Sequence, residues 1–366
     1  NADEEDANSL LINPLISLRD NDTRKERINY NLAGSITWEI IKDLKLKAEV
    51  GYDDYRNNAD RYYGVTTYYV RNNVDDEDKS KPAISFTRGT RTAFRSTNTL
   101  SYDFKKFFKN NKNHLNLLAG QEYIVTRERE LRNVVHGFPT EYTADDCINY
   151  STKGNPYEVT NYGYPDDVLF SFFGRANYDF DSKYLFSATF RADGSSKFAK
   201  GNQWGFFPSA AVAWRISSES FMENTKNWLD DLKLRFSYGT AGNNNIPSGQ
   251  ISQLYELNKT PWINGVNSYI APSKYMANSD LTWETTITRN VGLDFTTLGG
   301  RLSGTIEGYW NNTKDLLIMF PTSGTGYNYQ YRNMGETENK GLEASVNWVA
   351  VDKKNFGLSI GANISF

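Results

Sequence analysis

LFSFFGRANYDFDSKYLFSATFRAD, residues 169–193, is the stretch that determines the fold. Successive side chains of a β-strand point to opposite faces, so in its second half residues 184, 186, 188, 190 and 192 form an apolar face and those between them a mainly polar one. Each arm runs to roughly ten or more residues, about twice the usual strand length of a soluble sandwich. Long two-faced strands with aromatic ends are typical of a transmembrane β-barrel.

The same unit of strand, short turn, strand and long polar loop recurs along the chain, and turn chemistry predicts about twelve strands. They are expected near residues 24–40, 44–55, 84–104, 114–131, 168–180, 184–193, 206–216, 232–241, 283–297, 301–317, 335–349 and 356–366. Short links are expected near residues 42, 108, 182, 298 and 353, with a short helical link over 217–230. The predicted fold class is all-β, a transmembrane antiparallel up-and-down β-barrel.

Three segments carry local predictions. The residues Asp193, Gly194 and Ser195 suit a tight reversal, because glycine accepts positive φ and the other two bond the turn backbone. Residues 56–83 are expected to form a long loop. The charged stretch 126–132, TRERELR, is expected to be strand that extends beyond the membrane into water.

Composition agrees with a barrel whose strands have one wet face. The chain is 39% hydrophobic, its mean hydropathy is −0.64, and no run approaches the roughly eighteen apolar residues of a transmembrane helix. Half of each barrel strand and all of the loops face water, which lowers the mean. The net charge of 41 minus 44, or −3, does not suggest a nucleic-acid partner.

The residues that commonly carry catalysis or bind metals are scarce. Cys147 is the single cysteine, and the two histidines, His114 and His136, have no cysteine or carboxylate at metal-ligand spacing. Neither histidine accompanies a GxSxG-like serine. We therefore predict no enzyme activity, no catalytic residues, no metal site and no cofactor.

Aromatic and asparagine side chains of the predicted long loops are the candidate ligand-binding residues. Tyrosine and tryptophan offer flat apolar faces for sugar rings plus a hydrogen-bonding group. Loop packing, partner contact and, for asparagine, turn formation are alternative roles that stay open. The candidates are Tyr62, Tyr63, Tyr162, Tyr164, Asn243, Asn244, Trp262, Tyr269, Tyr327 and Tyr329.

Five stretches of the second half of the chain resemble one family in the right order. They are YLFSATFRADGSSKFAKGNQWGFFPSAAVAWRISSESFM (184–222), WLDDLKLRFSYGTAGNNNI (228–246), LTWETTITRNVGLDF (281–295), RLSGTIEGYWNNTKDLL (301–317) and NMGETENKGLEASVNW (333–348). Together they are similar to the SusC/RagA family of TonB-linked outer-membrane transporters. The first half resembles the family in architecture alone.

The resemblance implies import of glycans or oligopeptides through a plugged barrel of about 22 strands. It implies an outer membrane of Gram-negative type with the long loops extracellular. The expected partners are the lipid bilayer, a SusD-like lipoprotein lid, a glycan or peptide substrate, and TonB through a segment absent here. Residues 1–366 are expected to be a partial barrel domain without plug, TonB-contacting segment or terminal strands, because both ends fall on the long-loop side.

Three alternatives remain open from the sequence. Within transporters, the chain is a siderophore or cobalamin receptor. From another class, it is a soluble carbohydrate-binding β-sandwich. A rival to the partial barrel is a small twelve-stranded barrel that ends in LSIGANISF, residues 358–366, as its assembly signal.

Overall fold

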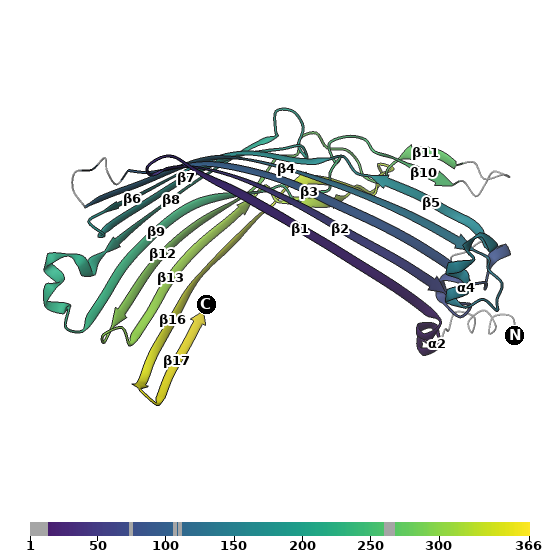
Figure 1. Cartoon of the computed structure of the whole chain (residues 1–366). Helices are drawn as coiled ribbons and strands as arrows, with labels where there is room; N and C mark the ends of the chain where they lie inside the picture. Colours follow the sequence, from purple (N-terminus) through teal and green to yellow (C-terminus); the bar gives the residue numbers. More distant parts are fainter. Residues whose placement is uncertain (1–13, 73–75, 105–107, 109–111, 260–267) are drawn as a thin grey trace. The chain divides into compact units, whose positions relative to one another are not determined.

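The computed structural model describes residues 14–72, 76–104, 108, 112–259 and 268–366, and this part of the chain is mostly β-strand (Figure 1). One antiparallel sheet of 13 strands dominates. Its strands, in order across the sheet, are β1 (Asn21–Ile41), β2 (Leu44–Tyr63), β3 (Ala83–Asp103), β4 (Asn113–His136), β6 (Asp167–Phe180), β7 (Tyr184–Ser195), β8 (Trp204–Arg215), β9 (Leu229–Asn243), β12 (Glu284–Thr297), β13 (Leu302–Lys314), β16 (Glu336–Lys353) and β17 (Phe356–Ser365), with β5 (Asn155–Gly163) beside β4.

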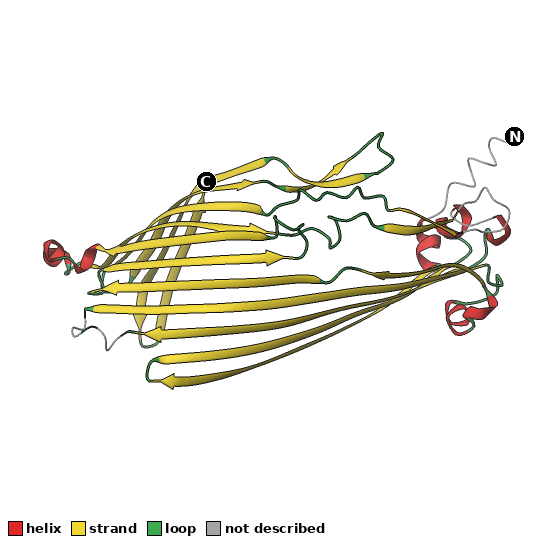
Figure 2. Ribbon diagram, turned by 90° about the horizontal axis from the view of Figure 1, so that it is seen from above, coloured by secondary structure: helices red, strands yellow, loops and turns green. Residues whose placement is uncertain are grey.

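Smaller elements occupy the connections. Two hairpins form separate two-stranded sheets, β10 (Tyr255–Lys259) with β11 (Ser268–Pro272) and β14 (Leu317–Pro321) with β15 (Tyr329–Asn333). The helices are short and lie at the strand ends (Figure 2): α2 (Pro14–Arg19), α3 (Tyr68–Asn72), α4 (Ala144–Asn149) and the 3-10 turns η1 (Asp76–Asp78), η2 (Ser151–Lys153), η3 (Ile216–Ser218) and η4 (Ser220–Thr225). Among the described residues, no helix has the length and apolar composition needed to cross a membrane.

The chain forms two compact units. The first contains the described residues of 1–33, 51–94 and 125–166, and the second those of 34–50, 95–124 and 167–366. A buried cluster of Ile84, Val135, Phe138 and Cys147 lies in the first unit. The core cluster of the second contains Phe198, Phe207, Ile246, Leu281 and Trp283. Both clusters combine residues of the connections with residues at strand ends. In each unit, the connections therefore pack against the strand ends around a buried apolar cluster.

The hairpin of β6 and β7 has the two-faced pattern predicted from its sequence. Its register is continuous from Phe180 opposite Tyr184 to Leu169 opposite Ser195. Exposed and partly buried residues alternate from Tyr184 to Arg191, with the aromatic side chains exposed. The prediction of a long strand with one apolar face is confirmed for this hairpin.

The turn of this hairpin has the backbone that its residues favour. Asp181 and Ser182 have φ of 57° and 54°, in the left-handed region that Asp and Ser tolerate better than bulky residues. The carboxylate of Asp179 accepts a hydrogen bond from the Ser182 N–H at 2.8 Å. The predicted short link near residue 182 is therefore a turn fixed by local side-chain bonding.

An exposed apolar belt runs from strand to strand. Phe186 lies opposite Val212, Val212 opposite Phe236, and Phe236 opposite Val291. Their exposed fractions are 48%, 41%, 46% and 47%, and Ile306 of β13 is 51% exposed. Burying such a side chain stabilises a protein by about 1.5–3 kcal/mol, and soluble proteins rarely expose contiguous apolar patches of this extent. In the described structure these side chains do not pack against a second sheet, as the soluble-sandwich alternative requires.

Several sequence-based boundaries were wrong. β2 continues to Tyr63, so Tyr62 and Tyr63 belong to a strand and not to a loop. β4 continues to His136, as the charged stretch after Thr126 predicted, but it also pairs with β5, a strand that the sequence analysis missed. The sequence NPYEVTNYG of β5 alternates apolar and polar residues only weakly, which is why it went unrecognised.

The tight reversal predicted at Asp193 to Ser195 was also wrong. These residues finish β7, where Asp193 pairs with Gly205 and Gly194 with Trp204. A Cβ on Gly194 would lie 3.1 Å from the Trp204 ring, so glycine is needed here for a close approach and not for a turn. The predicted helical link is confirmed as the two 3-10 turns η3 and η4.

A charge at position 186 tests whether the belt contacts lipid. We expect Phe186→Arg to destabilise the protein folded in a bilayer by about 2–4 kcal/mol, because it places a guanidinium on the hydrocarbon-facing side. Ser187→Arg, one residue away on the other face, is the matched control and should cost less than about 1 kcal/mol. The measurement is the folded fraction in lipid vesicles, read from heat-modifiable electrophoretic mobility against urea; equal losses in both variants would contradict a lipid-facing belt.

Candidate functional site

The polar face of the second unit carries an ion-pair network on three neighbouring strands. Arg235 of β9 donates from Nε and Nη2 to the two carboxylate oxygens of Asp294 on β12, both at 2.9 Å. Its Nη2 also bonds Glu307 of β13, and Lys233 lies 3.0 Å from Asp294. Gly292 leaves the space for this guanidinium, because a Cβ there would lie 2.8 Å from Nη2. The network cross-links strands distant in sequence on the face opposite the belt.

A second arginine, Arg191 of β7, links its strand to β4 and β6. Arg191 donates to Asp193 at 2.7 Å, to Glu122 at 2.9 Å and to the Ser171 hydroxyl at 3.0 Å. Its guanidinium also lies over the ring of Phe173, 5.5 Å from the centroid. Thus two arginines cross-link strands on the polar face, each through its Nε and Nη2 donors.

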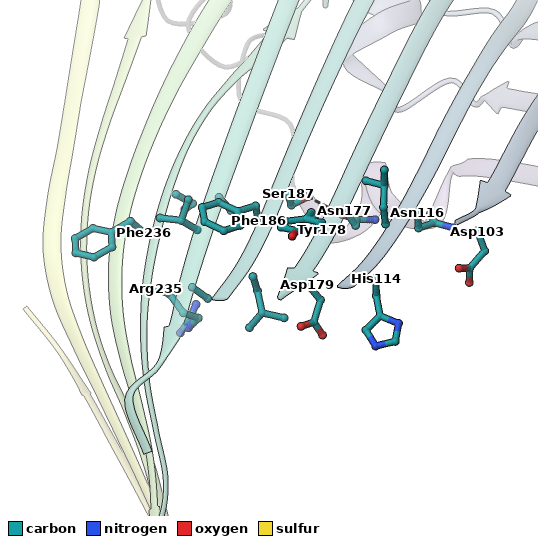
Figure 3. Close-up of a pocket in the computed structure, with 16 residues that line it drawn as sticks. Asp103, His114, Asn116, Asn177, Tyr178, Asp179, Phe186, Ser187, Arg235 and Phe236 are labelled. Carbon is teal, nitrogen blue, oxygen red and sulfur yellow. Dashed lines mark hydrogen bonds between the residues drawn. The ribbon is translucent and has the colours of Figure 1, made fainter. Parts of the chain in front are cut away.

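A hollow of about 430 Å³ lies on the main sheet in the second unit (Figure 3). It is lined from neighbouring strands by side chains that include His114, Tyr178, Arg235 and Phe236. Arg235 and Phe236 are consecutive in β9, and consecutive strand residues point to opposite faces. The lining therefore mixes residues of both faces and does not bring functional groups together as a catalytic site does. Among the described residues, no His, Cys, Asp and Glu side chains are grouped in a way that could hold a metal ion.

The candidate tyrosines of the first unit have different surroundings. Tyr62 is half-buried and donates its hydroxyl to the Tyr142 carbonyl at 3.3 Å. Tyr63 is 8% exposed and stacks on Tyr69 with ring centroids 4.2 Å apart. Tyr162 on β5 and Tyr164 just after it are exposed by 44% and 45%. The structure therefore packs the first pair into the unit and presents the second pair on its surface.

The candidates of the second unit mostly hold its loops together. Asn243 donates to Glu284 at 3.0 Å, and Asn244 donates to the Ser195 hydroxyl at 3.0 Å. Tyr327 donates its hydroxyl to Gln253 at 3.2 Å, while the Tyr329 ring lies 6.0 Å from that of Tyr275. Ligand contact by any of these residues stays a prediction.

Of the two remaining candidates, one lies outside the described residues and the other is described only in its backbone. Trp262 lies outside the described residues. For Tyr269 the structure describes the backbone, which pairs with Asn258 in the β10–β11 hairpin. The candidate set is thus distributed over both units, and within each unit its members occupy separate loops or strand ends.

The arginine networks are structural features that the sequence reasoning missed. The signal was present as charges at alternating positions on the polar faces of β9, β12 and β13: LKLR at 232–235, GLDF at 292–295 and TIEG at 305–308. Register decides which charges meet: Arg235 lies opposite Gly292, and Asp294, two residues further along β12, lies opposite Lys233. Without the register, the alternation indicates a wet face but not the partners.

Cys147 is enclosed in the core of the first unit. Its side chain is fully buried beside Phe138 and Ile84, on a helix whose first turn is capped reciprocally by Thr143 and Asp146. Burial raises the pKa of the thiol to about 12. The thiol is therefore protonated and enclosed, and Cys147 packs as a structural residue of this cluster.

A long wall of two-faced antiparallel strands, apolar outside and cross-linked by charges on the other face, defines an outer-membrane β-barrel. The chain belongs to the TonB dependent receptor-like β-barrel family, whose model matches residues 3–366. TonB-dependent receptors are outer-membrane β-barrel proteins, and the fold class predicted from the sequence is confirmed.

Relatives place the chain within this family. It is 41% identical over 206 residues to the TonB-dependent receptor SusC of Bacteroides thetaiotaomicron, covering 55% of the chain and 20% of that protein. It is 29% identical over 362 residues to the TonB-dependent receptor P39 of Formosa agariphila, covering 97% of the chain and 32% of that protein. The resemblance to SusC/RagA receptors is thus confirmed.

A solved structure supports the same placement. The RagAB peptide transporter aligns with a TM-score of 0.80 at 25% identity over 95% of the chain and 37% of its own chain. The chain therefore spans about a third or less of the length of the relatives named here.

Removing the central cation of the β9 network tests its contribution to stability. We expect Arg235→Gln to lower the free energy of unfolding by about 1–3 kcal/mol, because Asp294 and Glu307 lose their shared counter-charge in a half-buried setting. Lys314→Gln, which alters an exposed pair 4.0 Å from Glu336, is the control and should change it by less than about 0.5 kcal/mol. Urea titration in detergent micelles measures both, and equal effects would argue against the network.

The thiol of Cys147 should resist alkylation in the folded protein. With a pKa of about 12, about 10⁻⁴ of the thiol is ionised at pH 8, and the thiolate is the reactive form. We expect iodoacetamide to label the native protein negligibly at pH 8 and the urea-unfolded protein completely, by intact mass. Raising the pH toward the pKa of the thiol should increase the labelling rate of the native protein only slightly, because the sulfur stays buried. Fast labelling at pH 8 would show that the cluster around Cys147 opens.

Proposed function

We propose that this chain forms barrel wall and outer loops of a TonB-dependent importer of oligosaccharides or oligopeptides. The observation that carries the proposal is the alignment of 95% of the chain with the RagAB peptide transporter at a TM-score of 0.80. The 41% identity to SusC over half of the chain supports the same branch of the family. Because the chain spans only part of these relatives, residues 1–366 are proposed to be part of a larger barrel domain, and import is proposed for the whole protein.

The strand connections support an orientation for this wall. Turns such as the one at Asp181 and Ser182 are short, whereas the connections that contain α3, α4 and the two small hairpins are long. Outer-membrane barrels keep short turns on the periplasmic side and long loops outside. We infer that these long connections are extracellular and meet a SusD-like surface lipoprotein.

The β3–β4 and β8–β9 connections lie on the opposite side, with the short turns. Glu219, the residue before η4, accepts hydrogen bonds from the Tyr184 hydroxyl and from the Trp214 indole N–H. These bonds lower the pKa of its carboxyl and keep it ionised at neutral pH. An anchored carboxylate between two aromatic rings suits a membrane–water boundary.

Ligand binding by the full-length protein tests the import proposal. We expect the protein, purified in detergent with a SusD-like lipoprotein of the same organism, to co-elute with that lipoprotein and to bind oligosaccharides or oligopeptides in calorimetry. Ferric siderophores and cobalamin serve as the comparison ligands, because they represent the alternative receptor class. Binding of an iron chelate or cobalamin alone would sink the proposal.

A further inference from the structure

A row of aromatic and basic side chains crosses four strands of the second unit. Tyr238 of β9 lies opposite Arg289 of β12. Arg289 in turn lies opposite Trp310 of β13, and Trp310 lies opposite Lys340 of β16. Directly opposite residues of neighbouring strands point to the same face of a sheet. These four residues, the aromatic–basic row, therefore share one face.

The aromatic–basic row is on the same face as the apolar belt. Arg289 is two residues from Val291 in β12, and Tyr238 is two residues from Phe236 in β9, and such residues of a strand point to the same side. Val291 and Phe236 lie opposite one another in the belt. The side chains of Tyr238 and Trp310 are exposed by 46% and 48%. A guanidinium is thus on the face that the belt presents to hydrocarbon.

The row lies where the apolar face of β16 ends. Alternate residues from Leu342 to Trp348 are apolar, whereas Lys340, the next on this face, has a side chain that is 72% exposed. A tilted barrel strand crosses the hydrocarbon in about 9–11 residues. This number, counted back from Lys353 at the end of β16, ends near Leu342. The row is therefore at the boundary between hydrocarbon and water, on the side away from the short turns.

Arg289 has aromatic neighbours but no ionic partner among the described residues. Its guanidinium carbon lies 4.8 Å from the centroid of the Trp310 ring and 5.9 Å from that of Tyr238. Its Nη1 donates to Oδ1 of Asn312 at 2.9 Å, which is its one hydrogen bond within the described part of the chain. Arg235, on the other face, instead bonds two carboxylates. Nε and Nη2 of Arg289 are therefore available to a ligand.

The charges around the row leave it positive. Lys340 pairs with Glu338 at 3.1 Å, and the other oxygen of this carboxylate accepts from the indole N–H of the row at 3.0 Å. Further along, Lys314 and Glu336 form an exposed pair at 4.0 Å. Each lysine thus has a carboxylate, and within the described structure the charge of Arg289 is left over. A cation away from bulk water is costly without a counter-charge, so the row favours an anionic ligand.

The chemistry of the row suits the phosphate of a membrane lipid. A guanidinium is a planar fork of donors that matches two phosphate oxygens. Tryptophan and tyrosine are the residues that occupy the headgroup level of a bilayer. Beside them, Val291 and Leu342 expose 47% and 60% of their surface, which acyl chains can cover. A free anion would bind the guanidinium but leave this apolar surface uncovered.

We propose that the aromatic–basic row binds the phosphate of an outer-leaflet lipid. Arg289 donates to the phosphate through Nε and Nη2, Lys340 adds a second positive charge, and the acyl chains lie over the belt. The choice of the outer leaflet rests on the orientation given under the proposed function, whereas the lipid contact rests on the belt and on the charges of the row.

Removing the charge at position 289 tests the proposal. The full-length protein in detergent micelles is titrated with lipid A, whose headgroup carries phosphate, and with the same lipid after dephosphorylation. Native mass spectrometry counts the bound lipid. We expect Arg289→Gln to weaken binding of the phosphorylated lipid about tenfold and to leave binding of the dephosphorylated lipid unchanged, because one charge-assisted contact is lost. Arg289→Lys keeps the charge without the planar fork and should retain more binding than Arg289→Gln.

Arg175 provides the matched control. It is an exposed arginine in β6 of the same unit, and its Nε donates to the Thr189 hydroxyl at 3.2 Å. It also forms no ion pair within the described structure. It lies opposite Thr189, which is on the polar face of β7. We therefore expect Arg175→Gln to bind both lipids as the native protein does, with heat-modifiable electrophoretic mobility showing that each variant is folded. An equal loss in Arg175→Gln and Arg289→Gln would contradict the proposal.

Inorganic phosphate distinguishes a lipid site from a site for free anions. Excess phosphate should displace no more lipid A than sodium chloride of the same ionic strength, because it covers no apolar surface. Complete displacement by phosphate would overturn the lipid assignment. Equal affinity of the native protein for the phosphorylated and dephosphorylated lipids would show that Arg289 only extends to water, and the proposal would be wrong.

Cargo binding by the same preparation separates this site from import. A native protein that binds lipid A through Arg289 but binds neither oligosaccharides nor oligopeptides would refute the proposed function and support the lipid site. A native protein that binds cargo, with lipid binding that Arg289→Gln leaves unchanged, would support import and refute the lipid site.

Discussion

The alternation of one apolar and one polar side chain along each strand is the constraint on which this structure depends. It places the Phe186–Val212–Phe236–Val291 row on the outer surface and the Arg235–Asp294–Glu307 network on the other face of the same strands. A slip of one residue would exchange the two faces and set charges against lipid. The contact of the apolar side chains with hydrocarbon and the ion pairs on the other face therefore both favour the observed strand register.

The sequence predicts what depends on local periodicity and fails where contacts are distant. The hairpin around Asp181 and Ser182 was found because its apolar alternation and turn residues are contiguous. The extension of β2 beyond Tyr55 was missed, since RNNADRYY has no apolar alternation and pairs through its neighbours. The partnership of Arg235 with Asp294 was not accessible either, because 59 residues separate them and only register brings them together.

The candidate site shows the same division. The tyrosines were selected as loop residues rich in aromatic surface, yet Tyr63 is buried by stacking on Tyr69 and Tyr62 by bonding to Tyr142. The arginine networks instead depend on charges that the register brings together on neighbouring strands.

The length of β4 has a consequence for the surroundings of its backbone. Its 24 residues span about 80 Å at about 3.4 Å each, far more than the roughly 30 Å of bilayer hydrocarbon even after tilting. Much of this strand therefore extends into water, and its backbone there is already held by hydrogen bonds to the neighbouring strands. A backbone that is already fixed in this way loses little conformational freedom when another group binds to it.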